Sequence, residues 1–536
     1  MSPFLVVVAA AALLAPIFEH WDRPDSPGAA VAVARDGEII YADGFGLASL
    51  EFEVPIAPET PFHAGSIAKQ FTATAILMLE AEGKLSLEDK IRRHVPELPD
   101  VADSITLRQL LNHTSGLRDI WALTDLAGWM PGDVRTQDQA LRMLSRQRSL
   151  NFEPGNGFRY SNSGYLLLAE VVARISGQRF ETWMHERLFA PLGMAGTYFY
   201  QDPDRVLPNS ASSYRSLGRD QGFARDPLNS GLVGGGNLVT TLADLTRWAD
   251  HLLDAELAGA PLLARLTEQA SLPGGLETGY GMGLFVGNYR GLPVVHHGGA
   301  SAGYRSHLLI FVEENLSIVI LGNVNTIRAS ALANEIADVV LEGRFTASPP
   351  GATAEDVDPG LPPEAYIGLY ALGPRLLLDV RQTDGRLYFL FGGTTPREMF
   401  ARGPHTFITT EAGLSLTFTP DANRTVTGVV MEVPGLTLEG QRLQPDELSD
   451  KESRAYEGVY RSAELDCTYT IVADNGGLRA ERQRGDDFVL RPIDDDRFIE
   501  PEAGDLTVRF ERTGSGRVRG FELSVERAVG IRFEKR

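Results

Sequence analysis

The sequence predicts an α/β or α+β domain over residues 16–345, followed by two small antiparallel all-β barrel-like domains over residues 365–448 and 449–536. Three observations indicate this fold class. Strand patterns lie at both ends of the first part with helical patterns between them, residues 346–364 have the Pro-, Gly- and acid-rich composition of a linker, and the remaining chain repeats itself. A chain of 536 residues is also longer than one hydrophobic core normally organises.

The chain begins with an apolar run over residues 4–14, which has about the length of a signal-peptide core. Cleavage near Ala15 and Pro16 would remove residues 1–15 and place the protein in the periplasm or outside the cell. No Lys or Arg precedes the run, so a buried N-terminal helix in a cytoplasmic protein stays open as the alternative. No later segment predicts a membrane span.

The elements of the first domain follow from hydrophobic spacing. Strand patterns occupy residues 27–50, where Asp36-Gly37 forms the turn of a hairpin, and residues 293–297 and 305–322. Apolar residues at helical spacing predict helices over residues 66–82, 163–176, 241–254 and 329–342. Strands from the two ends of the domain are therefore expected to form one sheet with helices packed on it.

The C-terminal part contains two similar β-modules. Tyr366-Ile-Gly-Leu-Tyr370 returns as Tyr456-Glu-Gly-Val-Tyr460, and turn dipeptides such as Asn475-Gly476 separate short alternating runs. Neither module contains a recognisable catalytic group of residues. We interpret them as accessory domains, and expect a chain that ends near residue 345 to retain the chemistry of the first domain.

Charge and cysteine content exclude several classes of function. With 71 acidic and 50 basic residues, the net charge of −21 opposes binding to nucleic acid and to anionic membranes. A single cysteine, Cys467, excludes an intrachain disulfide framework and a cysteine-based zinc site. The isolated histidines, which lack metal-ligand spacing, are His20, His63, His113 and His251. We expect a small-molecule or peptide substrate, and neither a metal nor a cofactor. The sequence leaves the oligomeric state open.

The first chemical motif is Ser66-Ile-Ala-Lys69 at the start of a predicted helix. Residues three apart lie one turn apart on the same helical face, so the Lys69 amine can reach the Ser66 hydroxyl. Serine needs an adjacent base to become a strong nucleophile, and a buried lysine can supply one. The motif alone is also compatible with a surface Ser and Lys on an amphipathic helix.

Two further motifs support the catalytic interpretation. In Tyr160-Ser-Asn162, residues two apart in an extended segment face the same side, so the tyrosine can relay a proton while the asparagine amide holds a substrate carbonyl. In His297-Gly298-Gly299-Ala300, the glycines allow close backbone approach, and the N–H of Ala300 can join that of Ser66 in an oxyanion hole. Adjacent His296 and His297 on a strand face opposite sides, which argues against a shared metal ion.

The order and spacing of these three motifs resemble the active-site motifs of the serine β-lactamase and penicillin-binding-protein superfamily. They are most similar to the class C-like branch, peptidase family S12, in which His-x-Gly often replaces Lys-Thr-Gly. The resemblance covers roughly residues 25–345 and implies a β-lactamase-like transpeptidase fold. Residues 111–117 and 234–245 also resemble segments of the family, which we interpret as structural. Two C-terminal barrels add a resemblance to the D-aminopeptidases of that family.

The resemblance implies a metal-independent serine hydrolase that forms an acyl-enzyme on Ser66 and cleaves an amide or ester. Its catalytic residues would be Ser66, Lys69 and Tyr160, and its substrate-binding and oxyanion residues Asn162, His297, Gly299 and Ala300. D-amino-acid peptides, simple esters and, weakly, β-lactams are the candidate substrates. A carboxylesterase is one alternative, and a penicillin-binding receptor or scaffold with slow deacylation is another.

Overall fold

The computed structural model describes residues 13–218, 221–347, 357–373, 377–383, 385–391, 397–409, 414–433, 436–443, 447–494, 496–501 and 506–536. Most of the expected signal-peptide core, and residues 348–356 of the expected linker, fall outside the described residues. Residues 13–18 are helical, and Leu14 and Phe18 are buried in the core of the main sheet.

The chain divides into two compact units that do not follow a single cut in the sequence. The first comprises Met1–Leu117, Pro131–Ser145 and Phe152–Ala347. The second comprises Arg118–Met130, Arg146–Asn151 and Ser348–Arg536. Two short segments from the first half of the chain therefore belong to the same unit as the C-terminal modules.

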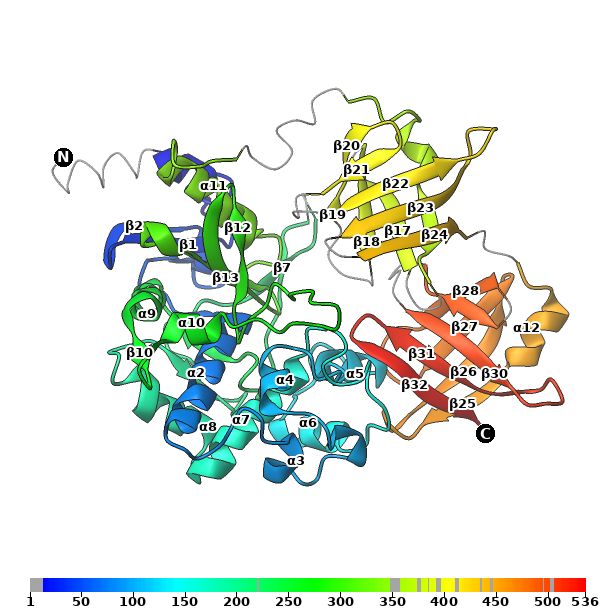
Figure 1. Ribbon diagram of the computed structural model, residues 1–536, viewed down its shortest axis with the longest axis horizontal. Coiled ribbons are helices and arrows are strands. Elements are labelled where there is room, and N and C mark those ends of the chain that lie inside the picture. Colours follow the sequence, from blue (N-terminus) through cyan, green and yellow to red (C-terminus); the bar gives the residue numbers. More distant parts are fainter. Residues whose placement is uncertain are drawn as a thin grey trace. The chain divides into compact units, whose positions relative to one another are not determined.

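The first unit is built on a six-stranded antiparallel sheet with the order β12-β13-β14-β15-β1-β2 (Figure 1). Its strands are β1 Ala29–Arg35, β2 Glu38–Phe45, β12 Phe285–Tyr289, β13 Leu292–Ser301, β14 Tyr304–Phe311 and β15 Leu316–Gly322. β1 pairs with β15 in the register Ala29↔Gly322, so the two ends of the domain meet at the centre of the sheet. Asp36 and Gly37 both have positive φ, as the predicted tight turn requires.

Helices pack on both faces of this sheet (Figure 1). α11 contacts β14 and β15 through residues such as Ile336, which shares a core with Val31 and Ile318, and α9 packs against β1 and β15. The α-helices of the first unit are α2 Ala68–Ala81, α3 Ile91–His94, α4 Leu107–Leu111, α6 Gln137–Leu144, α7 Asn162–Ser176, α8 Phe180–Met184, α9 Leu242–Asp254, α10 Leu262–Leu266 and α11 Ala329–Val340. The shorter helical turns are η1 Gly65–Ile67, η2 Asp100–Ala102, η3 His185–Phe189 and η4 Val312–Glu314.

Short strands join the helical region to the sheet. They are β3 Leu47–Ser49, β4 Val54–Pro55, β5 Phe62–His63, β6 Tyr198–Phe199, β7 Tyr214–Ser216, β8 Phe223–Arg225, β9 Leu238–Thr240, β10 Glu256–Leu257 and β11 Ala260–Pro261. In the three-stranded sheet β5-β9-β6, β9 holds β5 directly before the Ser-x-x-Lys motif.

The second unit contains the two predicted β-modules. The first is a nine-stranded antiparallel sheet whose edge strands β19 and β20 are consecutive in sequence, so that it forms a nearly closed barrel. Its strands are β16 Gly368–Ala371, β17 Leu377–Thr383, β18 Arg386–Phe391, β19 Arg397–Glu398, β20 Phe400–Gly403, β21 Thr406–Ile408, β22 Ser415–Pro420, β23 Val426–Val433 and β24 Leu436–Arg442. The turn η5 Pro363–Ala365 precedes it.

The second module is a closed eight-stranded barrel, β25 to β32, hereafter the last barrel. Its strands are β25 Gly458–Ser462, β26 Cys467–Asp474, β27 Gly477–Arg482, β28 Phe488–Asp494, β29 Arg497–Ile499, β30 Thr507–Arg512, β31 Val518–Val525 and β32 Ala528–Lys535. The second unit also holds α5 Ile120–Leu126 and α12 Asp450–Tyr456. The predicted architecture, one domain with helices packed on a sheet and two antiparallel barrel-like modules, is confirmed.

The sequence repeat forms the same contacts in both modules. The Tyr370 hydroxyl donates to Tyr366 O at 2.8 Å, and the Tyr460 hydroxyl donates to Tyr456 O at 2.5 Å. Each tyrosine pair fixes the entry of the chain into the first strand of its barrel.

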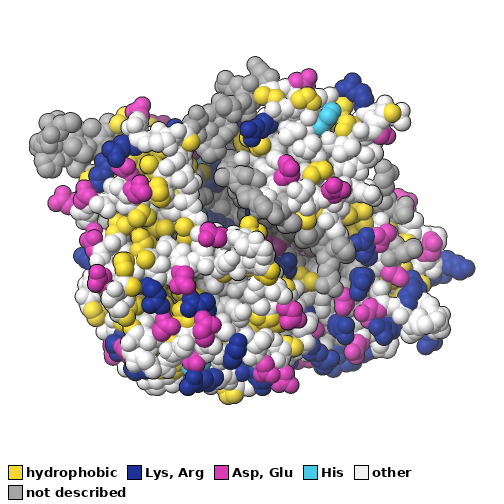
Figure 2. Space-filling view, viewed as in Figure 1, with side chains coloured by type: hydrophobic (Ala, Val, Ile, Leu, Met, Phe, Trp, Pro, Cys, Tyr) yellow, Lys and Arg dark blue, Asp and Glu magenta, His cyan; other side chains and the backbone are white. Residues whose placement is uncertain are grey.

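Acidic and basic side chains are interspersed on the surface drawn in Figure 2, with no broad basic field. Within the described residues, no helix combines the length and the apolar character needed to cross a membrane.

Candidate active site

Ser66 lies in the 3₁₀ turn η1, which leads directly into α2. The turn starts from fixed backbone, because Ala64 N–H donates to Leu238 O at 2.9 Å. Gly65 has φ +53°, and a Cβ at this position would lie 2.8 Å from Ala300 N. Both the backbone conformation and the close approach therefore require glycine. Ser66 is half-buried while the other two residues of the turn are buried, so it is the accessible residue of η1.

Lys69 is completely buried, and its Nζ donates to three acceptors. They are Ser66 Oγ at 3.1 Å, Asn162 Oδ1 at 2.8 Å and Gly235 O at 2.7 Å. An ammonium group has three N–H donors, so this arrangement can occupy all of them and hold the amine against the serine hydroxyl.

Tyr160 and Asn162 approach Lys69 from the start of α7. Asn162 is the first residue of that helix, and the residues before it are extended or in turns. Lys69 Nζ lies 4.8 Å from the centre of the Tyr160 ring. The two motifs that are distant in sequence therefore meet at one amine.

β13 brings the third motif to the same place. β12 pairs with β13 only as far as His296, and β14 pairs with the other side of β13 in the register Gly299↔Ser306. A Cβ on Gly299 would lie 2.0 Å from Ala64 O, so only glycine allows the strand to approach the turn that carries Ser66. Ala300 N lies beside Gly65, where it can pair with Ser66 N–H as an oxyanion hole.

His297 is buried and neutral. Its Nδ1 lies 2.6 Å from Gly298 O and its Nε2 3.1 Å from the Tyr280 hydroxyl, which fits an Nδ1–H donor and an Nε2 acceptor. Burial, and secondly the charge of Lys69, lower the pKa of His297 to about 3. An unperturbed histidine has a pKa near 6.5, so burial keeps His297 neutral at physiological pH.

His113 is a site residue that the sequence marked only as an isolated histidine without metal-ligand spacing. Its ring centre lies 4.3 Å from that of Tyr160 and 4.7 Å from that of Tyr280. Its Nδ1 accepts from Ser161 N–H at 3.2 Å, so the backbone beside Tyr160 is bonded to this ring. His113 also has φ +60°, an uncommon conformation for a residue other than glycine.

Gly235 is a second residue whose role the sequence did not indicate. Its carbonyl is the third acceptor of Lys69, and the neighbouring Gly234 O accepts from Thr72 Oγ1 at 2.8 Å. A Cβ on Gly234 would lie 2.2 Å from Tyr165 O. The run of three glycines could have indicated such a role in the sequence, because glycine runs mark places where the backbone approaches other groups closely.

The remaining histidines lie outside this cluster. His296 faces away from His297, as strand alternation predicts, and packs against His307 with ring centres 5.3 Å apart. His63 is buried beside Tyr200. In the part of the chain that the structure describes, no three His, Cys, Asp or Glu side chains gather as metal ligands.

Comparison with known proteins identifies the family and the fold. The family model described as Beta-lactamase matches residues 16–341. The chain is 27% identical over 525 residues to the D-aminopeptidase of Brucella melitensis biotype 1, covering 95% of this chain and 96% of that protein. It is 28% identical over 509 residues to the D-aminopeptidase of Gluconobacter oxydans, covering 92% and 93%.

Among solved structures, the octameric penicillin-binding protein homologue from Pyrococcus abyssi is similar to this chain with a TM-score of 0.57 and 22% identity. The match covers 82% of this chain and 100% of that one. At 22% identity, this similarity supports a shared fold and no more than that. The resemblance deduced from the three motifs is confirmed.

Proposed function

This chain belongs to the β-lactamase family, and on that premise we propose that it is a metal-independent serine amidohydrolase that forms an acyl-enzyme on Ser66. The observation that carries the proposal is the position of the Lys69 amine, 3.1 Å from Ser66 Oγ and bonded to Asn162 and Gly235. A buried amine held against a serine hydroxyl at a helix start is the arrangement that nucleophile activation needs.

The residues act in the following roles. In the reactive state Lys69 is the neutral amine: its two N–H groups bond Asn162 Oδ1 and Gly235 O, and its lone pair faces Ser66 Oγ. Ser66 Oγ attacks the substrate carbonyl, and its proton passes to Lys69 Nζ and on to Tyr160. The N–H groups of Ser66 and Ala300 stabilise the oxyanion, and Tyr160 returns the proton to the leaving amine. Water then attacks the ester of Ser66 by the reverse proton path, which releases the acid and restores the serine.

D-amino-terminal peptides and amides are the proposed substrates. The support is the match to proteins named D-aminopeptidase over 95% of this chain, which includes both barrels as well as the catalytic domain. The neutral His297 adds a second argument, because it offers no permanent cation for the carboxylate of a penicillin or of a C-terminal residue. Peptidase family S12 is the corresponding assignment.

A substrate panel tests the proposal. We expect turnover of D-Ala-p-nitroanilide to exceed that of L-Ala-p-nitroanilide and of nitrocefin, with p-nitrophenyl acetate as a reporter of general esterase activity. Preference for the acetate over both anilides would make the protein a carboxylesterase. Stoichiometric labelling by penicillin without turnover of any of these compounds would instead indicate a receptor with slow deacylation.

Labelling identifies the nucleophile independently of the substrate. Mass spectrometry after reaction with a fluorophosphonate should place one adduct on the peptide that contains Ser66, and none in Ser66→Ala. The matched control is Ser145→Ala, in a serine at the end of α6 whose hydroxyl donates to Arg142 O at 2.9 Å. Retention of labelling and activity in Ser66→Ala would overturn the proposal.

A further inference from the structure

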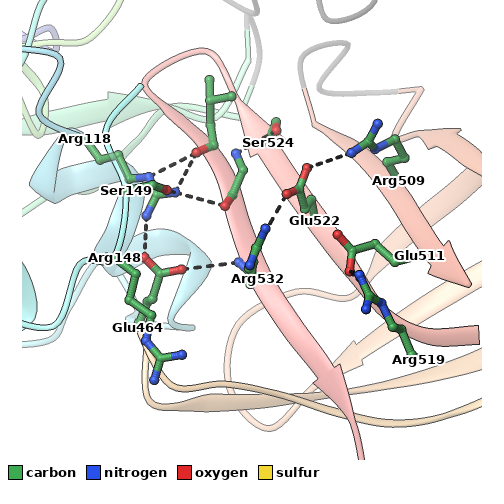
Figure 3. A network of polar contacts seen from close by, with 12 residues as sticks. Arg118, Arg148, Ser149, Glu464, Arg509, Glu511, Arg519, Glu522, Ser524 and Arg532 are labelled. Atoms are coloured by element: carbon green, nitrogen blue, oxygen red, sulfur yellow. Dashed lines mark hydrogen bonds and ion pairs between the residues drawn. The ribbon is translucent and has the colours of Figure 1, made fainter. Parts of the chain in front are cut away.

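Arg118 is buried completely and makes an unusually full set of bonds within the second unit (Figure 3). Its guanidinium donates to Glu464 Oε2 at 2.5 Å and to the backbone carbonyls of Val529 and Gly530 at 2.8 and 2.9 Å. It also donates to Gln147 Oε1 at 2.9 Å and Ser149 Oγ at 2.7 Å. One side chain thus joins two segments of the first half of the sequence to the last barrel.

Glu464 completes this arrangement from the start of the barrel. Its side chain is 2% exposed, and its carboxylate also accepts from Arg148 N–H at 2.9 Å and from Arg532 N–H at 3.4 Å (Figure 3). A buried charge pair is tolerable only when its remaining polar atoms are also bonded, and here they are. The pair is therefore held in one geometry.

The turn between β31 and β32 adds backbone bonds to the same two segments. Asp119 N–H donates to Arg527 O at 2.9 Å. Asn151 donates from Nδ2 to Arg527 O at 3.2 Å and accepts from Val529 N–H at 2.8 Å. We call Arg118, Glu464 and residues 526–530, which are this turn and the first three residues of β32, the barrel clamp.

The residues that precede Arg118 and those that follow Asn151 lead into the active site. The runs 113–117 and 152–161 belong to the first unit and are bonded to each other: Arg159 N–H donates to His113 O at 3.0 Å, and Gly155 N–H to Thr114 O at 2.8 Å. The first run continues covalently into Arg118, and the second begins directly after Asn151. His113 and Tyr160, whose ring centres lie 4.3 Å apart, therefore lie on runs whose far ends the clamp holds.

We propose that the barrel clamp positions the catalytic tyrosine: through Arg118 and Asn151 the last barrel fixes the runs that carry His113 and Tyr160, and so sets the place of the Tyr160 hydroxyl relative to Lys69. Arg118 is a positioning residue in this account, since it acts through the backbone and not on the substrate. The proposal rests on the proposed function only in giving Tyr160 the role of proton relay.

The test uses the full chain with Arg118→Met, Arg118→Lys and the milder Asn151→Ala, which removes two bonds to the turn. The matched control is Arg519→Met, which removes an exposed arginine paired with Glu511 in the same barrel. Active sites are counted by fluorophosphonate labelling, and kcat and KM are measured per labelled site. The amide resonance of Ser161, which donates to His113, reports the position of the run directly.

We expect Arg118→Met to lower kcat per site by about 10- to 100-fold with little change in KM, because the displaced group moves protons and does not bind substrate. Arg118→Lys and Asn151→Ala should show smaller losses, the Ser161 resonance should shift in step with them, and Arg519→Met should match the unmodified protein. If Arg118→Met does not fold, Arg118→Lys and Asn151→Ala still give the comparison.

The proposal is overturned if folded Arg118 and Asn151 variants keep a normal kcat per labelled site. This holds even if fewer of their sites are labelled, because the clamp would then have only a structural role. If the unmodified protein is not labelled at Ser66, the proposed function fails separately. The Ser161 resonance then decides about the clamp by itself: no shift in any of the variants would contradict it.

Discussion

At the scale of single residues, the active site depends on a buried amine with three acceptors. Replacing Lys69 by methionine keeps the volume but removes every bond to Ser66, Asn162 and Gly235. We expect turnover to fall by about 1,000-fold or more, since groups that act as a unit lose most of their effect together. The melting temperature should stay unchanged or rise, because a buried charge costs desolvation energy.

The control for Lys69→Met is Lys84→Met, which alters a lysine that is 45% exposed and pairs with Glu82. This variant should keep full turnover. If Lys69→Met retained more than about a tenth of the activity, a base other than Lys69 would be required.

Buried histidines predict a stability that depends on pH. Burial lowers the pKa of His63 and of His296 to about 4 and that of His297 to about 3. Each pKa is lower in the folded state than the unfolded value near 6.5, so the unfolded state binds more protons as the pH falls. The free energy of unfolding is therefore unaffected by protonation of these histidines above about pH 6.5. As the pH falls towards 4, it decreases by up to about 1.4 kcal/mol per pH unit for each histidine.

Urea unfolding between pH 7 and pH 4 measures this decline. In His296→Phe the unfolding free energy should fall less steeply as the pH decreases, because the contribution of one buried histidine is absent. His20→Phe serves as the control, in a histidine at an exposed position. A slope that His296→Phe leaves unchanged would mean that this histidine is protonated in the folded state.

At the scale of elements, the approach of β13 to the Ser66 turn depends on the absence of side chains at Gly65 and Gly299. A Cβ on Gly299 would lie 2.0 Å from Ala64 O, so Gly299→Ala must displace the strand or the turn. We expect a loss of acylation of about 100-fold or more, because the Ala300 N–H would no longer meet the oxyanion.

The matched substitution is Gly287→Ala on neighbouring β12, where a Cβ would meet nothing within 4 Å. It should leave both acylation and the melting temperature near those of the unmodified protein. Equal acylation by the two variants would contradict the role given to the Ala300 N–H.

The repeated tyrosine bonds allow the two β-modules to be compared. Tyr370→Phe and Tyr460→Phe each leave a backbone carbonyl without its hydroxyl donor. Each should lower the unfolding free energy of its own module by about 1–3 kcal/mol. Thermal unfolding followed by calorimetry tests this, and an effect in only one module would show that the repeat is not equivalent energetically.

At the scale of the whole molecule, the division into units changes what truncation should do. From the sequence, a chain ending near residue 345 was expected to keep its chemistry. Arg118–Met130 and Arg146–Asn151, however, belong to the second unit, where the Tyr469 hydroxyl donates to Leu126 O at 2.6 Å and Arg118 pairs with Glu464. Removing the barrels leaves the Arg118 charge without its partner.

We therefore expect a chain ending at residue 347 to be poorly soluble, or to label Ser66 at least about 10-fold more slowly than the full chain. A more informative truncation ends at residue 347 and also carries Arg118→Met, which removes the unpaired charge. Rapid labelling of Ser66 in either soluble truncation would restore the accessory interpretation of the barrels.

Export remains a prediction of the sequence. Cleavage after Ala15 would remove Leu14, which is buried in the sheet core, and would retain Phe18. N-terminal sequencing of the protein from its native cell distinguishes a processed chain that begins near residue 16 from an unprocessed one.

The sequence by itself determined the four longest helices of the first unit, most strands of its sheet, the two repeated modules and the three motifs around Ser66, because hydrophobic spacing, turn residues and helix geometry are local properties. The tertiary structure alone decided which groups meet from distant parts of the chain: Gly235 O at Lys69, His113 beneath Tyr160, and Arg118 with the last barrel. It also decided that His297 is neutral, since a pKa depends on burial and on neighbouring charges that no local pattern specifies.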